Sequence, residues 1–169
     1  MQKSLSILLL STAPVLAFAA GNHGGHDMGA MHGNMAGMHQ GEHNSAAGQA
    51  GDSAKVSRTI EVTMDDTMRF SPNQVSVKAG ETIRFFVKNA GKVPHEMVIG
   101  TTSELKAHAE MMRQMPGMKH AEANMVNLAA GKRGGIVWQF DKAGEVDFAC
   151  LIPGHMEAGM KGQIKVADN

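Results

Sequence analysis

Apolar and polar residues alternate along much of the chain after residue 56, and this pattern predicts short β-strands. In the segment TIEVTM (59–64), the alternation places Ile60, Val62 and Met64 on one side, with the two-residue period of a half-buried strand. Four further segments predict inward-facing sets in the same way: Val75 and Val77; Ile83, Phe85 and Val87; Ile136, Trp138 and Phe140; Val146, Phe148 and Cys150. Runs at 93–100 and 162–166 bring the prediction to at least seven strands. Short strands separated by glycine-rich turns are typical of an all-β fold, the Greek-key β-sandwich.

One segment departs from this alternation and predicts a short helix inserted into the sandwich. Thr101 and Glu104 have the spacing of a capping box. Good helix formers follow, and Pro116-Gly117 marks a stop. We therefore predict a helix over 103–115. Its helically spaced apolar residues should pack on the sandwich: Leu105, Ala109, Met112 and Met115.

The first 19 residues have the pattern of a secretory signal peptide. Lys3 supplies a positive charge, the apolar run Leu5–Leu10 follows, and Ala17-Phe18-Ala19 fits a small-x-small cleavage site. The apolar run is shorter than the roughly 20 residues that span a membrane. We therefore expect a mature chain without a membrane span, exported to a bacterial periplasm.

Residues 20–56 have the composition of a disordered tail, which leaves 57–169 as the folded domain. Residues 20–55 contain no leucine, isoleucine, valine or aromatic residue, so burial cannot offset the entropy lost on ordering. They do contain five histidines and four methionines: His23, His26, His32, His39, His43, Met28, Met31, Met35 and Met38. Thioether and imidazole groups bind soft and borderline metals. The tail could therefore bind additional Cu(I) ions, and the alternative is a solvated linker.

Charge and the single cysteine narrow the classes of partner. The chain has 16 basic and 16 acidic residues, so no basic excess points to nucleic acid or to an anionic membrane surface. We expect a monomer. Cys150 is the only cysteine, although exported proteins usually pair their cysteines. A lone exported cysteine forms an intermolecular disulfide, acts as a reactive thiol or binds a metal, unless it is simply a buried, inert thiol.

The residues around Cys150 favour a metal ligand. The segment FACLIPGHMEAGMKG places His155 and Met160 in the loop that follows it, and His95 lies 55 residues upstream on another predicted strand. Two imidazoles, a thiolate and a long axial thioether form the ligand set of blue-copper electron-transfer sites, whereas structural zinc sites seldom use methionine. We predict one copper site, alternating between Cu(I) and Cu(II), with these ligands: His95, Cys150, His155 and Met160. Met156 is a rival for the axial position.

A second group of soft and borderline ligands lies in and after the predicted helix. It consists of His108, Met111, Met118 and His120. These residues could form a second soft-metal site, or they could have no metal-binding role.

The sequence resembles the small cupredoxins, relatives of plastocyanin and azurin, over residues 56–166. The matching stretches are MRFSPNQVSVKAGETIRFFVKN, HEM and FACLIPGHMEAGMKGQIKV. The resemblance implies a cupredoxin-like sandwich with one type 1 copper site. Matched position by position, the ligands of the family fall on His95, Cys150, His155 and Met160.

Two departures from the family pattern affect what the resemblance implies. The loop from Cys150 to Met160 is more similar to nitrite-reductase-type and auracyanin-type sites than to those of plastocyanin or azurin, which leaves a blue or a green site open. Small cupredoxins often have asparagine after the first histidine, where this chain has Glu96, so the support of the ligand loop is also open. The tail and the insertion at 101–125 resemble periplasmic cupredoxins of bacterial copper-tolerance systems.

Two functions follow from these features. One is periplasmic copper handling and tolerance, with a capacity for one-electron transfer. The other is a soluble periplasmic electron carrier to a respiratory or oxidase partner. We favour the first, because an electron carrier gains nothing from the metal-binding residues of the tail. The apolar rim around His155 could dock a redox or copper-transfer protein. We expect no enzymatic activity, because multicopper oxidases need a second copper cluster built largely from His-x-His pairs, and this chain has none.

Overall fold

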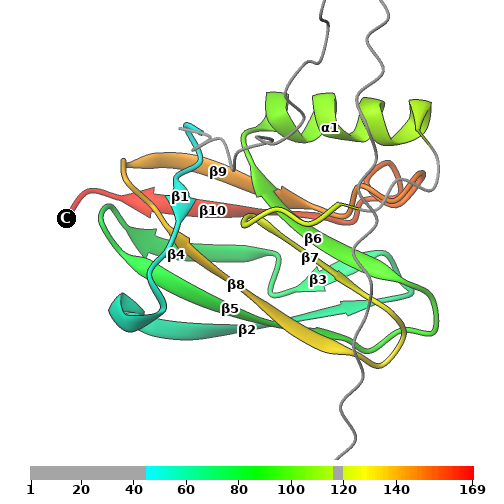
Figure 1. Cartoon of the computed structure of the whole chain (residues 1–169), viewed down its shortest axis with the longest axis horizontal. Helices are drawn as coiled ribbons and strands as arrows, with labels where there is room; N and C mark the ends of the chain where they lie inside the picture. Colours follow the sequence, from blue (N-terminus) through cyan, green and yellow to red (C-terminus); the bar gives the residue numbers. More distant parts are fainter. Residues whose placement is uncertain (1–44, 116–119) are drawn as a thin grey trace, which may run out of the picture. The chain divides into compact units, whose positions relative to one another are not determined.

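The computed structural model describes residues 45–115 and 120–169, and it consists of two five-stranded β-sheets packed face to face (Figure 1). The first sheet has the order β1 (Gln49–Ala50), β8 (Arg133–Gln139), β5 (Thr82–Asn89), β2 (Arg58–Asp65) and β3 (Arg69–Ser71). The second has the order β4 (Gln74–Lys78), β10 (Lys161–Ala167), β9 (Gly144–Ala149), β6 (His95–Gly100) and β7 (Met125–Leu128). The predicted all-β sandwich is confirmed.

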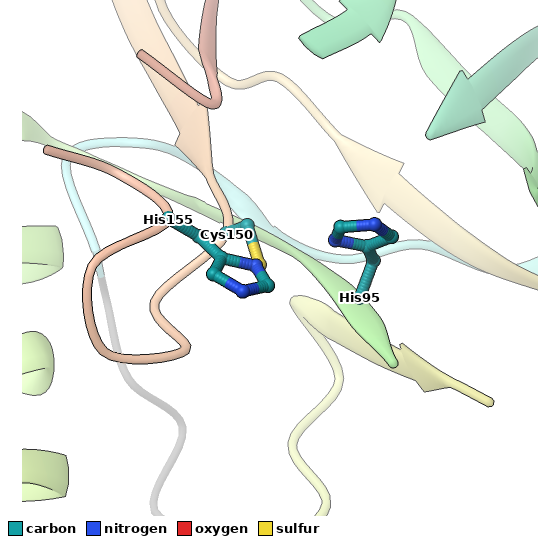
Figure 2. Close-up of side chains that lie close together, drawn as sticks. All are labelled: His95, Cys150 and His155. Carbon is teal, nitrogen blue, oxygen red and sulfur yellow. The ribbon is translucent and has the colours of Figure 1, made fainter. Parts of the chain in front are cut away.

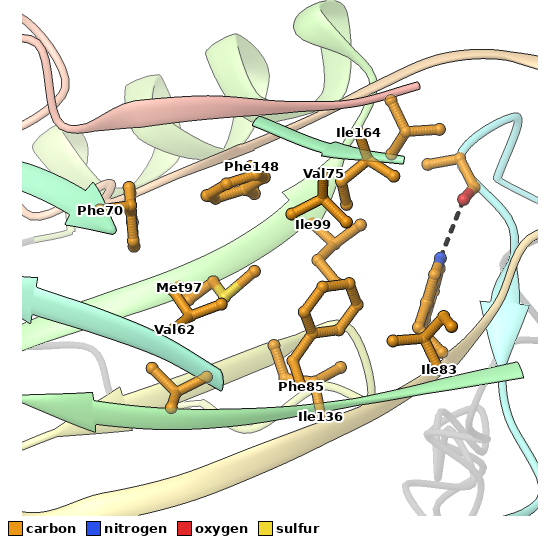
Figure 3. Packing of buried hydrophobic residues seen from close by; sticks show 14 of the residues in the cluster. Val62, Phe70, Val75, Ile83, Phe85, Met97, Ile99, Ile136, Phe148 and Ile164 are labelled. Carbon is orange, nitrogen blue, oxygen red and sulfur yellow. Dashed lines mark hydrogen bonds between the residues drawn. The ribbon is translucent and has the colours of Figure 1, made fainter. Parts of the chain in front are cut away.

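The core lies between the two sheets and is built from the residues that the alternation placed inward. Phe85 of β5 lies opposite Ile136 of β8 in the antiparallel register, and both are buried. Figure 3 shows these two side chains facing Ile99 and Ile164 of the second sheet. Burial of each large apolar side chain contributes about 1.5–3 kcal/mol. Val146 and Phe148 of β9, the strand that ends one residue before Cys150, belong to the same core cluster.

The predicted helix is present as α1 (Thr102–Gln114), and its capping box is confirmed. The Thr101 hydroxyl accepts a hydrogen bond from the Glu104 N–H, and the Glu104 carboxylate accepts one from the Thr101 N–H. The helix packs on the outer face of the second sheet, where Leu105 joins a small apolar cluster. This contact explains why β6 is buried along its whole length. The prediction that Met115 packs on the sandwich is wrong, because this residue follows the helix and is 40% exposed.

The ordered domain begins earlier than residue 57. Residues 45–56 run along the edge of the first sheet, where β1 pairs with β8 and a short 3-10 helix follows over Ser53–Lys55. Ala47 is 2% exposed, and its carbonyl accepts a hydrogen bond from the Trp138 indole N–H at 2.8 Å. The prediction that 45–56 belong to a disordered tail is therefore wrong. The buried indole needs an acceptor, and this segment provides it.

The predicted signal peptide (1–19) and the histidine- and methionine-rich part of the predicted tail (20–44) lie outside the described residues. Met118 does as well. Among the residues that are described, no helix is both long and apolar enough to cross a membrane.

Candidate metal centre

Three of the four predicted ligands converge at one end of the sandwich. His95 is the first residue of β6, Cys150 follows the last residue of β9, and His155 lies in the loop beyond it. Figure 2 shows the His155 ring beside the Cys150 sulfur, with His95 on the other side of it. The Cys150 Sγ and the His155 Nδ1 are 3.3 Å apart, and one ligand atom from each residue lies within 4.8 Å of the others.

His95 presents one ring nitrogen that has no partner. The side chain is fully buried, and its Nε2 is 3.1 Å from the Asp66 Oδ1. The Nδ1 atom is buried and has no hydrogen-bond partner among the described residues. An unsatisfied buried polar atom costs about 1–3 kcal/mol. A metal ion at this point would satisfy the Nδ1 atom.

Cys150 is buried, and its sulfur accepts a weak hydrogen bond from the Glu96 backbone N–H at 3.5 Å. Burial raises the pKa of the thiol to about 11, against the lowering effect of hydrogen bonds from the Glu96 and Ile152 backbones. Without a metal, the group is therefore a neutral thiol at neutral pH. A bound cation would replace this proton, because the thiolate is the form that coordinates metals.

Glu96 supports the start of the ligand loop. Its Oε1 accepts a hydrogen bond from the Leu151 N–H at 3.0 Å, and its Oε2 accepts one from the Asn127 Nδ2 at 3.2 Å. This buried carboxylate thus links β6, β7 and the residue after Cys150. Glu96, which stands where small cupredoxins often have asparagine, therefore supports the ligand loop itself.

The loop from Cys150 to Met160 is closed by its own backbone hydrogen bonds. The Met160 N–H donates to the His155 carbonyl at 3.0 Å, and the Cys150 N–H donates to the Met160 carbonyl at 3.1 Å. The Arg69 guanidinium from β3 donates to the Ala158 carbonyl at 2.8 Å. Gly159 has a φ of +102°, which favours glycine, and a Cβ there would lie 2.7 Å from the Arg69 Nη1. Hydrogen bonds therefore join the two ends of the loop to each other, and further ones hold it at His155 and Ala158.

The two candidate axial methionines lie in different environments. Met160 is fully buried and belongs to the core cluster that contains Cys150. Met156 is half-buried and packs against the separate cluster beneath α1, which includes Leu105 and Leu151. The environment of Met160 therefore favours it over Met156 as the fourth ligand.

A second group of potential ligands lies at α1 and the segment after it. The His108 and His120 Nε2 atoms are 2.8 Å apart, and the His120 Nε2 is 4.0 Å from the Glu122 Oε1. The His120 Nδ1 is buried and has no hydrogen-bond partner among the described residues. Burial and the neighbouring His120 lower the pKa of His108. The sequence predicted the two histidines but missed Glu122, while Met111 is half-buried on α1.

Comparison with known proteins identifies the family. The model of copper binding proteins of the plastocyanin/azurin family matches residues 54–167. The chain belongs to this family. It is a small cupredoxin, as the sequence predicted, and copper is its cofactor. The donor set fits this metal, because thiolate and thioether sulfur suit Cu(I) and imidazole suits both oxidation states.

Two relatives and one solved structure show how closely other cupredoxins are related. The chain is 51% identical to the copper-resistant cuproprotein CopI of Rubrivivax gelatinosus over 158 residues, covering 94% of each chain. It is 35% identical to CopI of Vibrio cholerae over 170 residues, covering 98% of this chain and 99% of the relative. Dithionite-reduced auracyanin from Roseiflexus castenholzii superposes with a TM-score of 0.56 at 25% identity, covering 66% of this chain and 98% of the auracyanin.

Proposed function

We propose that this cupredoxin is a periplasmic copper-handling protein, with one type 1 copper ion bound by His95, Cys150, His155 and Met160. Two observations carry the site: His95 lies in one group with Cys150 and His155, and its buried Nδ1 has no hydrogen-bond partner among the described residues. Each of these residues is held by the fold itself. The sequence predicted these four residues as ligands, and the grouping of His95, Cys150 and His155 supports that prediction.

The bound ion would supply one-electron chemistry between Cu(II) and Cu(I). The protein keeps the ligands in place during such a change: His95 and Cys150 are anchored at strand ends, and the loop hydrogen bonds hold His155 and Met160. A donor set that tolerates both oxidation states with little rearrangement favours fast electron transfer. The proposed role is to bind, buffer or pass on copper, without catalysis on an organic substrate.

Copper tolerance is supported by features beyond this site. The relatives that cover nearly the whole chain are named as copper-resistant cuproproteins. The sequence between the predicted signal peptide and residue 44 is rich in histidine and methionine. The group of His108, His120 and Glu122 offers a second place for a borderline metal such as copper. An electron carrier has no need of these additional ligands.

A soluble electron carrier is the second candidate, supported by the surface next to His155. This histidine is half-buried, and apolar residues surround it: Ile152 and Met156, which are half-buried, and Pro153 and Ala158, which are exposed. A small apolar surface beside a metal ligand suits brief docking of a redox protein. The same surface would also suit a copper-transfer partner.

Growth experiments separate the two functions. A deletion strain should lose tolerance to excess copper but grow normally on respiratory substrates, and Cys150→Ser should restore tolerance only in part. Removal of residues 20–44 should lower tolerance while the site keeps its colour. Normal tolerance combined with impaired respiratory growth would favour the electron carrier instead.

The end point of that deletion matters for its interpretation. A longer deletion, to residue 50, would also remove Ala47 and leave the Trp138 indole N–H without its acceptor. An unsatisfied buried donor costs about 1–3 kcal/mol. The longer deletion therefore serves as a control for stability, measured as the unfolding free energy of the metal-free protein.

A further inference from the structure

The buried ring of His95 contacts one charged side chain among the described residues, that of Asp66. It lies in the turn between β2 and β3, and its side chain is 39% exposed. Its Oδ1 is 3.1 Å from the His95 Nε2, and its Oδ2 accepts a hydrogen bond from the Lys92 N–H at 2.8 Å. The carboxylate thus lies between the solvent and a fully buried imidazole.

These contacts determine which nitrogen of His95 carries the proton. A carboxylate can only accept hydrogen bonds, so a hydrogen bond to Asp66 requires the proton to be on Nε2. The lone pair of the neutral ring is then on Nδ1, the buried nitrogen that has no hydrogen-bond partner among the described residues. The hydrogen bond from the Lys92 N–H holds the Asp66 carboxylate in place beside the ring.

A carboxylate behind a histidine ligand also changes how strongly the ring donates to a metal. Such outer partners fix the tautomer and orientation of the ring and increase its basicity. A stronger nitrogen donor favours Cu(II) over Cu(I), because Cu(I) is the softer ion. The negative charge itself acts in the same direction.

We propose that Asp66 is the positioning residue of the copper site: it fixes His95 as the Nε2–H tautomer and lowers the reduction potential of the bound copper. This inference rests on the proposed function, because it takes His95 to be a ligand. It assigns a role to a residue that neither the spacing nor the ligand set singled out. Asp66 acts through His95 and does not itself touch the metal.

A purely structural role for Asp66 makes different predictions. The carboxylate also ties its own turn to the loop before β6, through the Lys92 N–H and, at 3.4 Å, the Val93 N–H. If that were its whole role, its loss would change stability but not the potential or the tautomer. Asp66→Asn separates the two roles, since asparagine keeps an acceptor oxygen and loses the charge.

Asp65→Asn is the matched control. It removes the same charge one position away, and the Asp65 carboxylate accepts a hydrogen bond from the Thr67 N–H at 2.9 Å. No contact between Asp65 and His95 is recorded among the described residues. Any shift in potential that comes only from the loss of one surface charge should appear equally in both variants.

The experiment compares the copper-loaded full chain with its two variants by redox titration, and the metal-free proteins by nitrogen NMR of the His95 ring. Asp66→Asn should weaken Cu(II) binding about 10- to 100-fold, as outer-partner substitutions do, with a smaller loss for Cu(I). A tenfold loss of Cu(II) over Cu(I) affinity corresponds to a potential about 59 mV higher. Asp65→Asn should give a much smaller shift.

In the metal-free wild type, the His95 proton should be on Nε2, and Asp66→Ala should increase the share of the other tautomer. Equal potentials for the Asp66→Asn and Asp65→Asn variants would overturn the inference while leaving the copper site intact. A wild-type ring protonated on Nδ1 would overturn it as well. The NMR measurement needs no bound copper, so failure of the proposed function is distinguishable from failure of this proposal.

Discussion

The two groups of histidines in this cupredoxin are held in different ways. His95 and Cys150 are fully buried at the ends of adjacent strands of one sheet, and backbone hydrogen bonds close the loop that carries His155. His108, by contrast, lies on the half-exposed side of α1, and its neighbour His120 lies in the segment that leads to β7. The first group has sulfur from Cys150, and the second has a carboxylate from Glu122.

This difference separates two tasks that a copper protein can perform. A buried group with fixed geometry suits one ion that changes its oxidation state in place. A partly exposed group on a helix can gain and lose an ion without opening the core. Burial and strand anchoring, rather than the number of histidines, therefore distinguish the proposed redox site from the group of His108, His120 and Glu122.

The largest expected effect is the loss of colour when the sulfur is removed. Cys150→Ser should abolish the visible thiolate-to-copper absorption of the Cu(II) protein, because that absorption requires the sulfur. The double variant His108→Ala and His120→Ala should keep the absorption unchanged. Absorption spectra of both loaded proteins check this, and a colourless Cu(II) form of the wild type would contradict the assignment of the buried site.

The second expected effect is the loss of one bound ion from the group of His108, His120 and Glu122. The double variant should bind one metal ion fewer per chain than the wild type, measured by metal analysis after copper loading and desalting. The side chains removed lie on a half-exposed helix and the segment after it, so the unfolding midpoint of the metal-free protein should barely change. Equal stoichiometry in both proteins would rule out a second site there.

The third prediction concerns the axial ligand within the buried group. Met160→Leu should keep the copper and raise the reduction potential, because loss of a weak axial donor favours Cu(I). Met156→Leu is the matched control, since this residue packs beneath α1 instead. If redox titration shows a shifted reduction potential only for the Met156→Leu variant, then Met156 and not Met160 is the axial ligand.

The smallest expected effect is the release of protons on copper binding at neutral pH. Because burial raises the pKa of Cys150 to about 11, loading of the buried group should release about one proton per ion, and its affinity should fall as pH falls. Burial and the neighbouring His120 lower the pKa of His108, so loading of the second group should release fewer protons than loading of the buried group. The number of protons released per bound ion is measured by calorimetry in two buffers of different ionisation enthalpy. Cys150→Ser is the control, because it removes the thiol that supplies the proton.

Much of the fold could be predicted from the sequence, because strands and helix caps are local patterns. The alternation gave the inward faces of β5 and β8, and the capping box at Thr101 gave the start of α1 to within one residue. Three short strands were missed: β1 has two residues, β3 has three and β7 has four. Segments of this length are too short to show a period, and their pairing depends on neighbours that are distant in the sequence.

The sequence also predicted candidate donors that the structure brings together, namely His95, Cys150 and His155, but not the residues that position them. Asp66 meets His95 across 29 positions, Glu96 meets Leu151 across 55, and Ala47 meets Trp138 across 91. None of these partners has a local signature, since an aspartate in a turn and an alanine in a glycine-rich stretch are both ordinary. Their roles follow only from the packing of the folded chain.

The indole of Trp138 has a practical consequence for following the protein in solution. It is the only tryptophan, and the chain has no tyrosine, so near-ultraviolet fluorescence reports almost entirely on one place. That place is where residues 45–50 attach to the first sheet. Absorbance of the Cys150–copper bond would report separately on the other sheet, at the ligand loop. Detachment of the N-terminal segment and opening of the metal site can therefore be timed independently in one unlabelled sample.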